Sequence, residues 1–262
     1  MTKSTSPLSF APAPTAPGED VHITHPDRAG FLDDLAMRMA AREGFTVATI
    51  NLDHIVKLRR DAAFASAYRA HSHVVADGNP IVWLSRVAGQ KVDLIPGSEL
   101  IEPLSIRAAA ANVGVALVGA TDETLEAAAT ALEASHPGLR VACRIAPPMG
   151  FDPDGNKATR IAEELRKADA GLCFLALGAP KQERLAVRLA QEVPGCGFVS
   201  IGAGLDFIAG SQTRAPFWVR RLALEWVWRM ASNPRRLAAR YAACIAILPG
   251  LALKALRARA RG

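Results

Sequence analysis

Four polar turns, each directly after an apolar, strand-like run, carry the residues of this chain whose types could do chemistry. The first turn follows the run 45–52 and holds Thr49, Asn51 and Asp53. Side chains alternate along a strand, so Thr49 and Asn51 point to the same side, where both could hydrogen-bond a sugar. Asn51 and Asp53 are equally suited to capping the helix that follows. Both interpretations stay open at this stage.

The second turn, VVADGNP, places Asp77 where a short strand ends. Gly78 permits an unusual backbone angle, and Pro80 suits the first turn of a helix. An acid in this position can face a ligand and act as a general base. The alternative is a turn aspartate that only caps its own backbone.

The third turn, GAPKQE, joins another apolar strand to a helix and ends in Glu183. Gly178 lets a ligand approach the backbone, while Lys181 and Gln182 can reach a phosphate or a base edge. A helix N-terminus also favours anions. A plain strand-to-helix turn does not need this polar set, so the turn predicts a ligand-binding site.

The fourth turn, GAGLDFIAG, begins with Gly202 and Gly204 like a dinucleotide-binding fingerprint. Phe207 stands where the third glycine of that fingerprint belongs, so the Rossmann dinucleotide motif fails here. Asp206 either contacts a ribose or uracil or caps its own turn.

These turns are positioned by strands that alternate with helices, a pattern that predicts βαβ units and a mostly parallel, Rossmann-like α/β sheet flanked by helices. Ligands of such sheets bind outside the carboxyl ends of the strands, where the four turns lie. The expected strands are 45–52, 73–76, 113–118, 139–145, 171–177 and 197–201, and the expected helices include 31–42, 55–70, 123–134 and 157–167.

No metal site is expected. His71 and His73 form an HxH pair without further ligands at matching spacing, and the acids of Asp152-Pro153-Asp154 lie in a Gly/Pro turn. The four cysteines are widely spaced without a CxxC pair, which fits a reducing, cytoplasmic compartment.

The chain has 262 residues and a net charge of +6, and its basic excess lies in the tail. We therefore divide it into a flexible leader (1–28), an α/β core (29–213) and a helical, basic, membrane-associating appendage (214–262). The tail indicates anionic partners such as phospholipid head groups or phosphorylated ligands, and we expect no nucleic acid. No apolar run reaches the about 18 to 20 residues needed to span a bilayer, and the longest, 242–253, is interrupted by Pro249 and Gly250.

Taken as an ordered set, the motifs resemble the WecG/TagA/CpsF family, glycosyltransferase family 26. The matching segments are TINLDH (49–54), ADG (76–78), PGSEL (96–100), GAPKQE (178–183), GAGLDFIAG (202–210), RAP-x-W (214–218), LEWVWR (224–229) and NPRR (233–236), which precedes Arg240 and Tyr241.

The resemblance implies an inverting, metal-independent transferase without a cofactor. Such an enzyme moves a sugar from a UDP-sugar, the donor substrate, to a polyprenyl-diphosphate-linked sugar in polysaccharide synthesis. The donor sugar stays open between an N-acetylmannosamine type and a glucose type. The family's appendage implies a peripheral position on the cytoplasmic face of the membrane, and a homo-oligomer is an open possibility.

The resemblance also assigns roles. It makes Asp77 the catalytic base, supported by Thr49 and Asn51. The appendage arginines are expected to contact a diphosphate. The expected substrate-binding residues are Gly178, Lys181, Gln182, Glu183, Gly202, Gly204, Asp206, Arg214, Arg229 and Arg236.

One position departs from the family pattern. Many members carry an arginine three residues before the glycine of PGSEL, and this chain has Leu94 three residues before Gly97. We expect the cation to be missing or supplied by Arg86 or Lys91. A non-catalytic, nucleotide-binding assembly module on the membrane is the alternative function.

Overall fold

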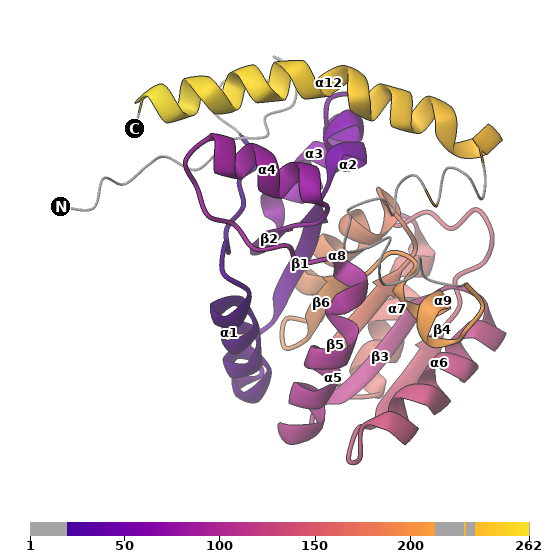
Figure 1. Cartoon of the computed structure of the whole chain (residues 1–262). Coiled ribbons are helices and arrows are strands. Elements are labelled where there is room, and N and C mark those ends of the chain that lie inside the picture. Colours follow the sequence, from indigo (N-terminus) through magenta and orange to yellow (C-terminus); the bar gives the residue numbers. More distant parts are fainter. Residues whose placement is uncertain (1–19, 213–227, 229–233, 262) are drawn as a thin grey trace.

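The computed structural model describes residues 20–212, Trp228 and residues 234–261. Its centre is a six-stranded, all-parallel sheet in the order β2-β1-β6-β5-β3-β4, which confirms the expected Rossmann-like α/β class (Figure 1). The strands are β1 (Phe45–Ile50), β2 (His73–Ala76), β3 (Gly114–Gly119), β4 (Val141–Ile145), β5 (Ala170–Ala176) and β6 (Gly197–Ser200).

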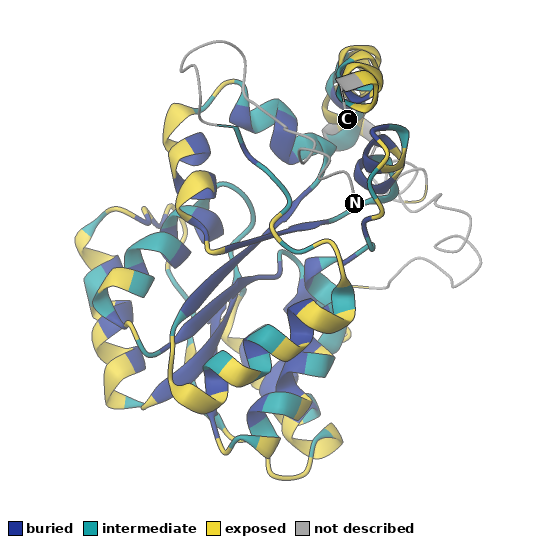
Figure 2. Ribbon diagram, turned by 90° about the vertical axis from the view of Figure 1, so that its left-hand side faces the viewer, coloured by how far each residue is buried: buried dark blue, intermediate teal, exposed yellow. Residues whose placement is uncertain are grey.

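Helices cover both faces of the sheet. The helical elements are α1 (Arg28–Ala41), α2 (Leu52–Leu58), α3 (Ala62–Ala70), α4 (Asn79–Val87), η1 (Gly97–Glu99), α5 (Ile101–Ala110), α6 (Asp122–Ser135), α7 (Asn156–Lys167), α8 (Lys181–Glu192), α9 (Gly204–Ile208) and α12 (Pro234–Arg261). Apolar residues of α1, α5 and α6 pack on one face, and those of α7 and α8 pack on the other. Figure 2 shows the buried strands between helices whose outer sides are exposed.

The strands read as continuous apolar runs because neighbouring residues enter different cores. In β5, Phe174 belongs to the cluster under α1, α5 and α6, while Leu175 belongs to the cluster under α7 and α8. Strands of parallel sheets are buried on both sides and lose the alternation of polar and apolar residues.

The expected single helix 55–70 is wrong, because the segment forms two helices, α2 and α3. Asp61 is the reason for the break: its side chain accepts a hydrogen bond from Phe64 N at 2.9 Å and starts α3. An aspartate in this role offers the backbone an alternative to continuing the first helix. Tyr68 of α3 is thereby packed beneath the end of β1.

The C-terminal helix α12 runs unbroken through Pro249 and Gly250, the two residues that interrupt the apolar run 242–253 in the sequence. A proline inside a helix removes one backbone hydrogen bond. Packing compensates, since Leu251 and Ala255 are buried in a cluster shared with α2 and α4, across which α12 lies (Figure 1). By length and composition alone, Leu237–Ala260 is long and apolar enough to cross a membrane, so the expectation that no apolar stretch reaches that length is wrong.

The described part of the expected leader, residues 20–27, lies along the edge strand β2. Thr24 N donates to Val74 O at 2.9 Å, and Val21 is buried. The limits of the leader, core and appendage stay predictions, because the junction near residue 213 falls outside the described residues.

Candidate active site

The sheet order brings the four predicted turns together. The strands that precede them, β2, β1, β6 and β5, are consecutive neighbours in the sheet. All strands are parallel, so their carboxyl ends share one edge. The turns at Asp77, Asn51, Gly202 and Gly178 therefore form one continuous row along that edge.

Asp77 is held by both polar residues of the first turn. Thr49 Oγ1 and Asn51 Nδ2 each donate to Asp77 Oδ2 at 3.4 Å. Asn51 also caps α2, since its Oδ1 accepts from His54 N at 2.9 Å. The side-chain amide of Asn51 therefore caps α2 and contacts Asp77 at the same time.

The backbone after Asp77 turns sharply away from the sheet. Asp77 N still donates to Ile50 O at 2.8 Å and extends the pairing of β1 with β2 by one residue. Gly78 then has φ 101°, a conformation that side-chain-bearing residues rarely adopt, and α4 begins directly behind it. The carboxyl of Asp77 thus sits at a strand end in front of a helix N-terminus, a position suited to a general base.

Gln182 fastens the third turn to the fourth. Its Oε1 accepts from Gly178 N at 3.2 Å and from Gly202 N at 3.1 Å, although the side chain is almost fully buried. Its Nε2 donates to Glu183 Oε1 at 2.9 Å. Because one amide joins the two turns, the spacing between the ends of β5 and β6 is fixed by side chains as well as by the sheet.

Glu183 is fully buried, and its Oε2 has no hydrogen-bond partner among the described residues. Burial raises the pKa of Glu183 to about 7, against the lowering effects of the Gln182 hydrogen bond and of Lys57. The carboxyl therefore titrates near neutrality rather than remaining ionised.

Glycine occurs in these turns for two different physical reasons. Gly178 and Gly202 have φ of 71° and 57°, and no described residue has an atom within 4 Å of where a side chain would start. Gly204 is required by packing instead, because an added Cβ would lie 2.6 Å from Ile101 Cδ1. Gly97 of PGSEL is similar, with Ser200 O at 2.7 Å from the position of its missing Cβ.

Asp206 lies in α9, half-buried, and its contacts are within its own turn. Gln212 Nε2 donates to Asp206 Oδ2 at 3.1 Å, and Ser211 Oγ donates to Asp206 O at 3.1 Å. The carboxylate accepts from the side chains of Ser211 and Gln212 and not, in the contacts of the described residues, from a backbone N–H, so self-capping and contact with a nucleotide both stay predictions. Lys181 begins α8 beside Gln182.

A family profile decides what this arrangement belongs to. The profile described as the glycosyl transferase WecG/TagA/CpsF family matches residues 19–262. The chain belongs to this family.

Two similar relatives carry one name, N-acetylglucosaminyldiphosphoundecaprenol N-acetyl-beta-D-mannosaminyltransferase. The Bacillus subtilis (strain 168) protein is 24% identical over 196 residues, which cover 74% of this chain and 73% of the relative. The Staphylococcus aureus (strain MW2) protein is 28% identical over 192 residues, which cover 73% of each chain. The resemblance predicted from the motifs is confirmed, and the protein is a glycosyltransferase of the hexosyltransferase type.

An ionic cluster at the site of this WecG/TagA/CpsF glycosyltransferase has no signal in the motif spacing. Arg240 of α12 forms a two-pronged ion pair with Asp53, with Nε–Oδ1 at 2.6 Å and Nη2–Oδ2 at 2.7 Å. Lys57 Nζ lies 2.9 Å from Asp53 Oδ2 and donates to Ala179 O at 3.1 Å. The cluster therefore joins α12 and the first turn to the GAPKQE turn.

Asp53 is kept ionised by these partners. Burial alone would raise its pKa, but hydrogen bonds from Arg240 and Lys57 bring the pKa below its ordinary value. The sequence shows Asp53 as a candidate cap and Arg240 as part of the family match, but it does not show that the two residues pair, because they lie 187 residues apart in the chain.

A buried pair supports the first turn of the glycosyltransferase from beneath. Tyr68 OH donates to Thr49 O at 2.7 Å, so the contact at 2.7 Å between Tyr68 OH and His54 Nδ1 places the hydrogen on the histidine. Burial lowers the pKa of His54 to about 4 and raises that of Tyr68, so both groups are neutral at physiological pH. They fix the backbone of the residue that holds Asp77.

Three expected arginines cannot be placed at the site. Arg214 and Arg229 lie outside the described residues, and so does the side chain of Arg236, although its backbone belongs to α12. Their contacts with a diphosphate stay predictions.

The position that departs from the family pattern is a packing position. Leu94 is partly buried against the apolar cluster under α2, α3 and α12. Arg86 is exposed near the far end of α4, about 10 Å along the helix axis from Asn79 at 1.5 Å per residue. Lys91 is exposed beyond it. Among the described cations, Lys57 and Arg240 are bonded to predicted turns.

The HxH pair is split by the fold. His71 Nδ1 contacts Ala67 O, whereas His73 Nε2 contacts Asp34 Oδ2 at 2.7 Å, and His25 stacks on His73. Atoms of His25, Asp34 and His73 lie within 4.8 Å of one another, but Arg38 also donates to Asp34 Oδ2 at 3.0 Å. The carboxylate oxygen that a metal would use is therefore already shared by a guanidinium.

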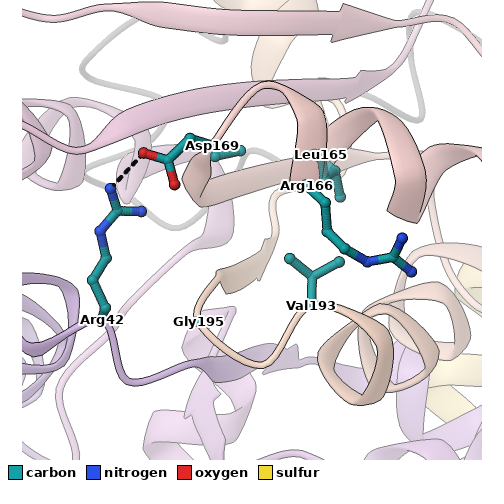
Figure 3. Close-up of a pocket in the computed structure, with 7 residues that line it drawn as sticks. Arg42, Leu165, Arg166, Asp169, Val193 and Gly195 are labelled. Carbon is teal, nitrogen blue, oxygen red and sulfur yellow. Dashed lines mark hydrogen bonds and ion pairs between the residues drawn. The ribbon is translucent and has the colours of Figure 1, made fainter.

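A hollow formed by described residues lies at the opposite edge of the sheet, at the amino ends of β1, β5 and β6 (Figure 3). Its cavity volume is about 360 Å³. Both arginines that line it are paired, Arg42 with Asp169 at 2.9 Å and Arg166 with Glu192 at 3.7 Å. Neither guanidinium is left to attract a ligand, so the carboxyl edge remains the candidate active site.

Proposed function

We propose that this glycosyltransferase moves N-acetylmannosamine from a UDP-sugar to N-acetylglucosaminyl-diphosphoundecaprenol, with inversion and without a metal, in the synthesis of a cell-surface polymer. The observation that carries the proposal is the carboxylate of Asp77, oriented by Thr49 and Asn51 at the carboxyl edge of the sheet. The names of the relatives support the acceptor, and they favour N-acetylmannosamine over a glucose-type donor.

In this mechanism the acceptor hydroxyl lies between Asp77 and the anomeric carbon of the donor. Asp77 takes the hydroxyl proton as the oxygen attacks, and the bond to UDP breaks on the opposite face of the sugar, so the configuration inverts. General-base assistance of this kind accelerates a reaction about 10²- to 10⁴-fold, or roughly 3 to 5 kcal/mol of barrier.

The leaving diphosphate develops negative charge that must be stabilised. The N-terminus of α8, with Lys181 in its first turn, offers the positive end of the helix dipole and a cation beside the turns at Gly178 and Gly202. We assign the remaining positive charge to Arg214, Arg229 and Arg236, following the resemblance.

We further propose that α12 lies on the cytoplasmic surface of the membrane. Leu251 and Ala255 face the core, while Ile245, Leu253 and Leu256 are about half exposed on the other side of the helix. Exposed cations, among them Arg257 and Arg259, stand beside that apolar face. An amphipathic helix of this kind buries its apolar side among lipid acyl chains and keeps its cations at anionic head groups.

The test is a transfer assay with purified protein, a panel of UDP-sugars and a short-chain polyprenyl-diphosphate-N-acetylglucosamine acceptor, run with EDTA. The proposal predicts acceptor-dependent UDP release with UDP-N-acetylmannosamine and a product of inverted anomeric configuration by NMR. Release with UDP-glucose alone would reassign the donor. UDP binding without release from any donor would favour the non-catalytic assembly module.

A further inference from the structure

We propose that Glu183 is a positioning residue that fixes the Gln182 amide and, through it, the spacing of the Gly178 and Gly202 turns. The inference rests on the proposed function in one respect, which is that these two turns enclose the nucleotide of the donor.

The Gln182 amide is held in one orientation by its hydrogen-bond partners. Its Oε1 accepts from two backbone N–H groups, those of Gly178 and Gly202. If the amide were reversed, its NH₂ group would face two donors and leave both buried hydrogen bonds unmade. The accepting Glu183 Oε1, 2.9 Å from Nε2, is the group that selects the observed orientation.

The burial of Glu183 is not explained by the packing of the core. The side chain is fully buried, and Oε2 has no hydrogen-bond partner among the described residues. A buried polar atom without a partner costs stability, so an apolar side chain would serve packing better at this position. A carboxyl group at this position is therefore explained by the hydrogen bond that Oε1 accepts from Gln182, and not by a contribution to the stability of the core.

The protonation state of Glu183 depends on its burial and on its neighbours. Lys57 of α2 is the charged group that acts on the pKa of Glu183. Glu183 and Asp77, at the end of β2, in turn raise the pKa of Tyr68 of α3. Burial is the largest influence and raises the pKa of Glu183 to about 7. With the proton on Oε2, Oε1 remains an acceptor for Gln182, so the neutral form satisfies the network.

The charge of Glu183 sets the direction in which the affinity for UDP should change with pH. Above about pH 7 Glu183 ionises. Its negative charge then lies behind two turns that are proposed to receive an anionic diphosphate. The affinity for UDP should therefore fall as pH rises through this range, in addition to any other titration, and removing the ionisable group should remove this fall.

The experiment compares Glu183→Gln and Glu183→Leu with Glu192→Gln, a control at the far end of α8. NMR measures amide hydrogen exchange at Gly178 and Gly202 without nucleotide, and calorimetry measures UDP affinity from pH 6 to 8.5. Glu183→Leu should speed exchange of both amides at least tenfold and weaken UDP binding by a similar factor. Glu183→Gln should keep slow exchange and bind UDP with an affinity that no longer falls above pH 7.

Unchanged exchange in a folded Glu183→Leu protein would overturn the positioning role, as would an undiminished pH dependence in Glu183→Gln. If Glu183→Leu does not fold, the pH dependence of Glu183→Gln alone decides. If the wild-type protein does not bind UDP, the donor assignment fails while the amide exchange still decides the role of Glu183.

Discussion

Asn51 Nδ2 lies 3.4 Å from Asp77 Oδ2, while Asn51 Oδ1 accepts the hydrogen bond that caps α2 at 2.9 Å. One amide therefore begins a helix and orients the proposed catalytic base. An aspartate could cap the helix but could not donate to a carboxylate, so the amide is the group that satisfies both requirements.

Asn51→Asp should separate these two roles. The cap survives because aspartate and asparagine cap equally well, but a second carboxylate now faces Asp77. Two carboxylates that share a site hold a proton more tightly, so the acid limb of the kcat/KM–pH profile should move up by about one pH unit or more. Asn51→Ser is the control, since it keeps a capping oxygen and adds no charge. If the acid limb of the kcat/KM–pH profile lay at the same pH in Asn51→Asp and in Asn51→Ser, the result would show that Asn51 does not act on Asp77.

The ion pair between Asp53 and Arg240 should fasten α12 to the site. A double-mutant cycle with Asp53→Asn and Arg240→Gln, measured by urea unfolding, should give a coupling energy of about 0.5 to 1 kcal/mol, because Arg240 is half exposed and screened by solvent. The looser contact of Lys254 with Asp20, at 4.0 Å, is the matched control and should give almost none.

The same pair predicts a pH dependence of stability. The pKa of Asp53 is lowered by Arg240 and Lys57, so its contribution is complete above the unfolded value of 3.8 and is lost as pH falls through the lower folded value. The coupling should therefore be constant from pH 5 to 8. A coupling that declined between pH 6 and 8 would contradict this assignment.

Much of this site could be predicted from sequence because its residues lie within short turns after apolar strands. Asp77, Asn51 and Gln182 are each fixed by a local pattern, and a parallel sheet brings such turns to one edge. The roles of Lys57, Tyr68 and Arg240 could not be predicted, although Arg240 belongs to the family match, because these roles arise from contacts between different elements. Local patterns also misjudged one helix and one apolar stretch: Asp61 divides 55–70 into two helices, and α12 continues through Pro249, so Leu237–Ala260 is long enough to span a bilayer.

The outer face of α12 should mediate membrane binding. Replacing Ile245, Leu253 and Leu256 together by serine removes the exposed apolar face without touching Leu251 or Ala255, which are buried. Sedimentation with vesicles containing anionic phospholipid should show at least a tenfold loss of binding, with an unchanged melting temperature. Three alanine-to-serine changes on other surfaces serve as controls. Equal sedimentation of all proteins would place the membrane contact elsewhere.

Asp77→Asn tests the central claim most directly. The asparagine keeps the size of the side chain but cannot accept a proton, so acceptor-dependent UDP release should fall about 10²- to 10⁴-fold while UDP affinity stays within a few-fold of wild type. Asp33→Asn, in which a side chain 71% exposed is changed in α1, should leave both quantities unchanged. Asp77→Asn with wild-type turnover would show that Asp77 is not the base, and the proposed mechanism would then be wrong.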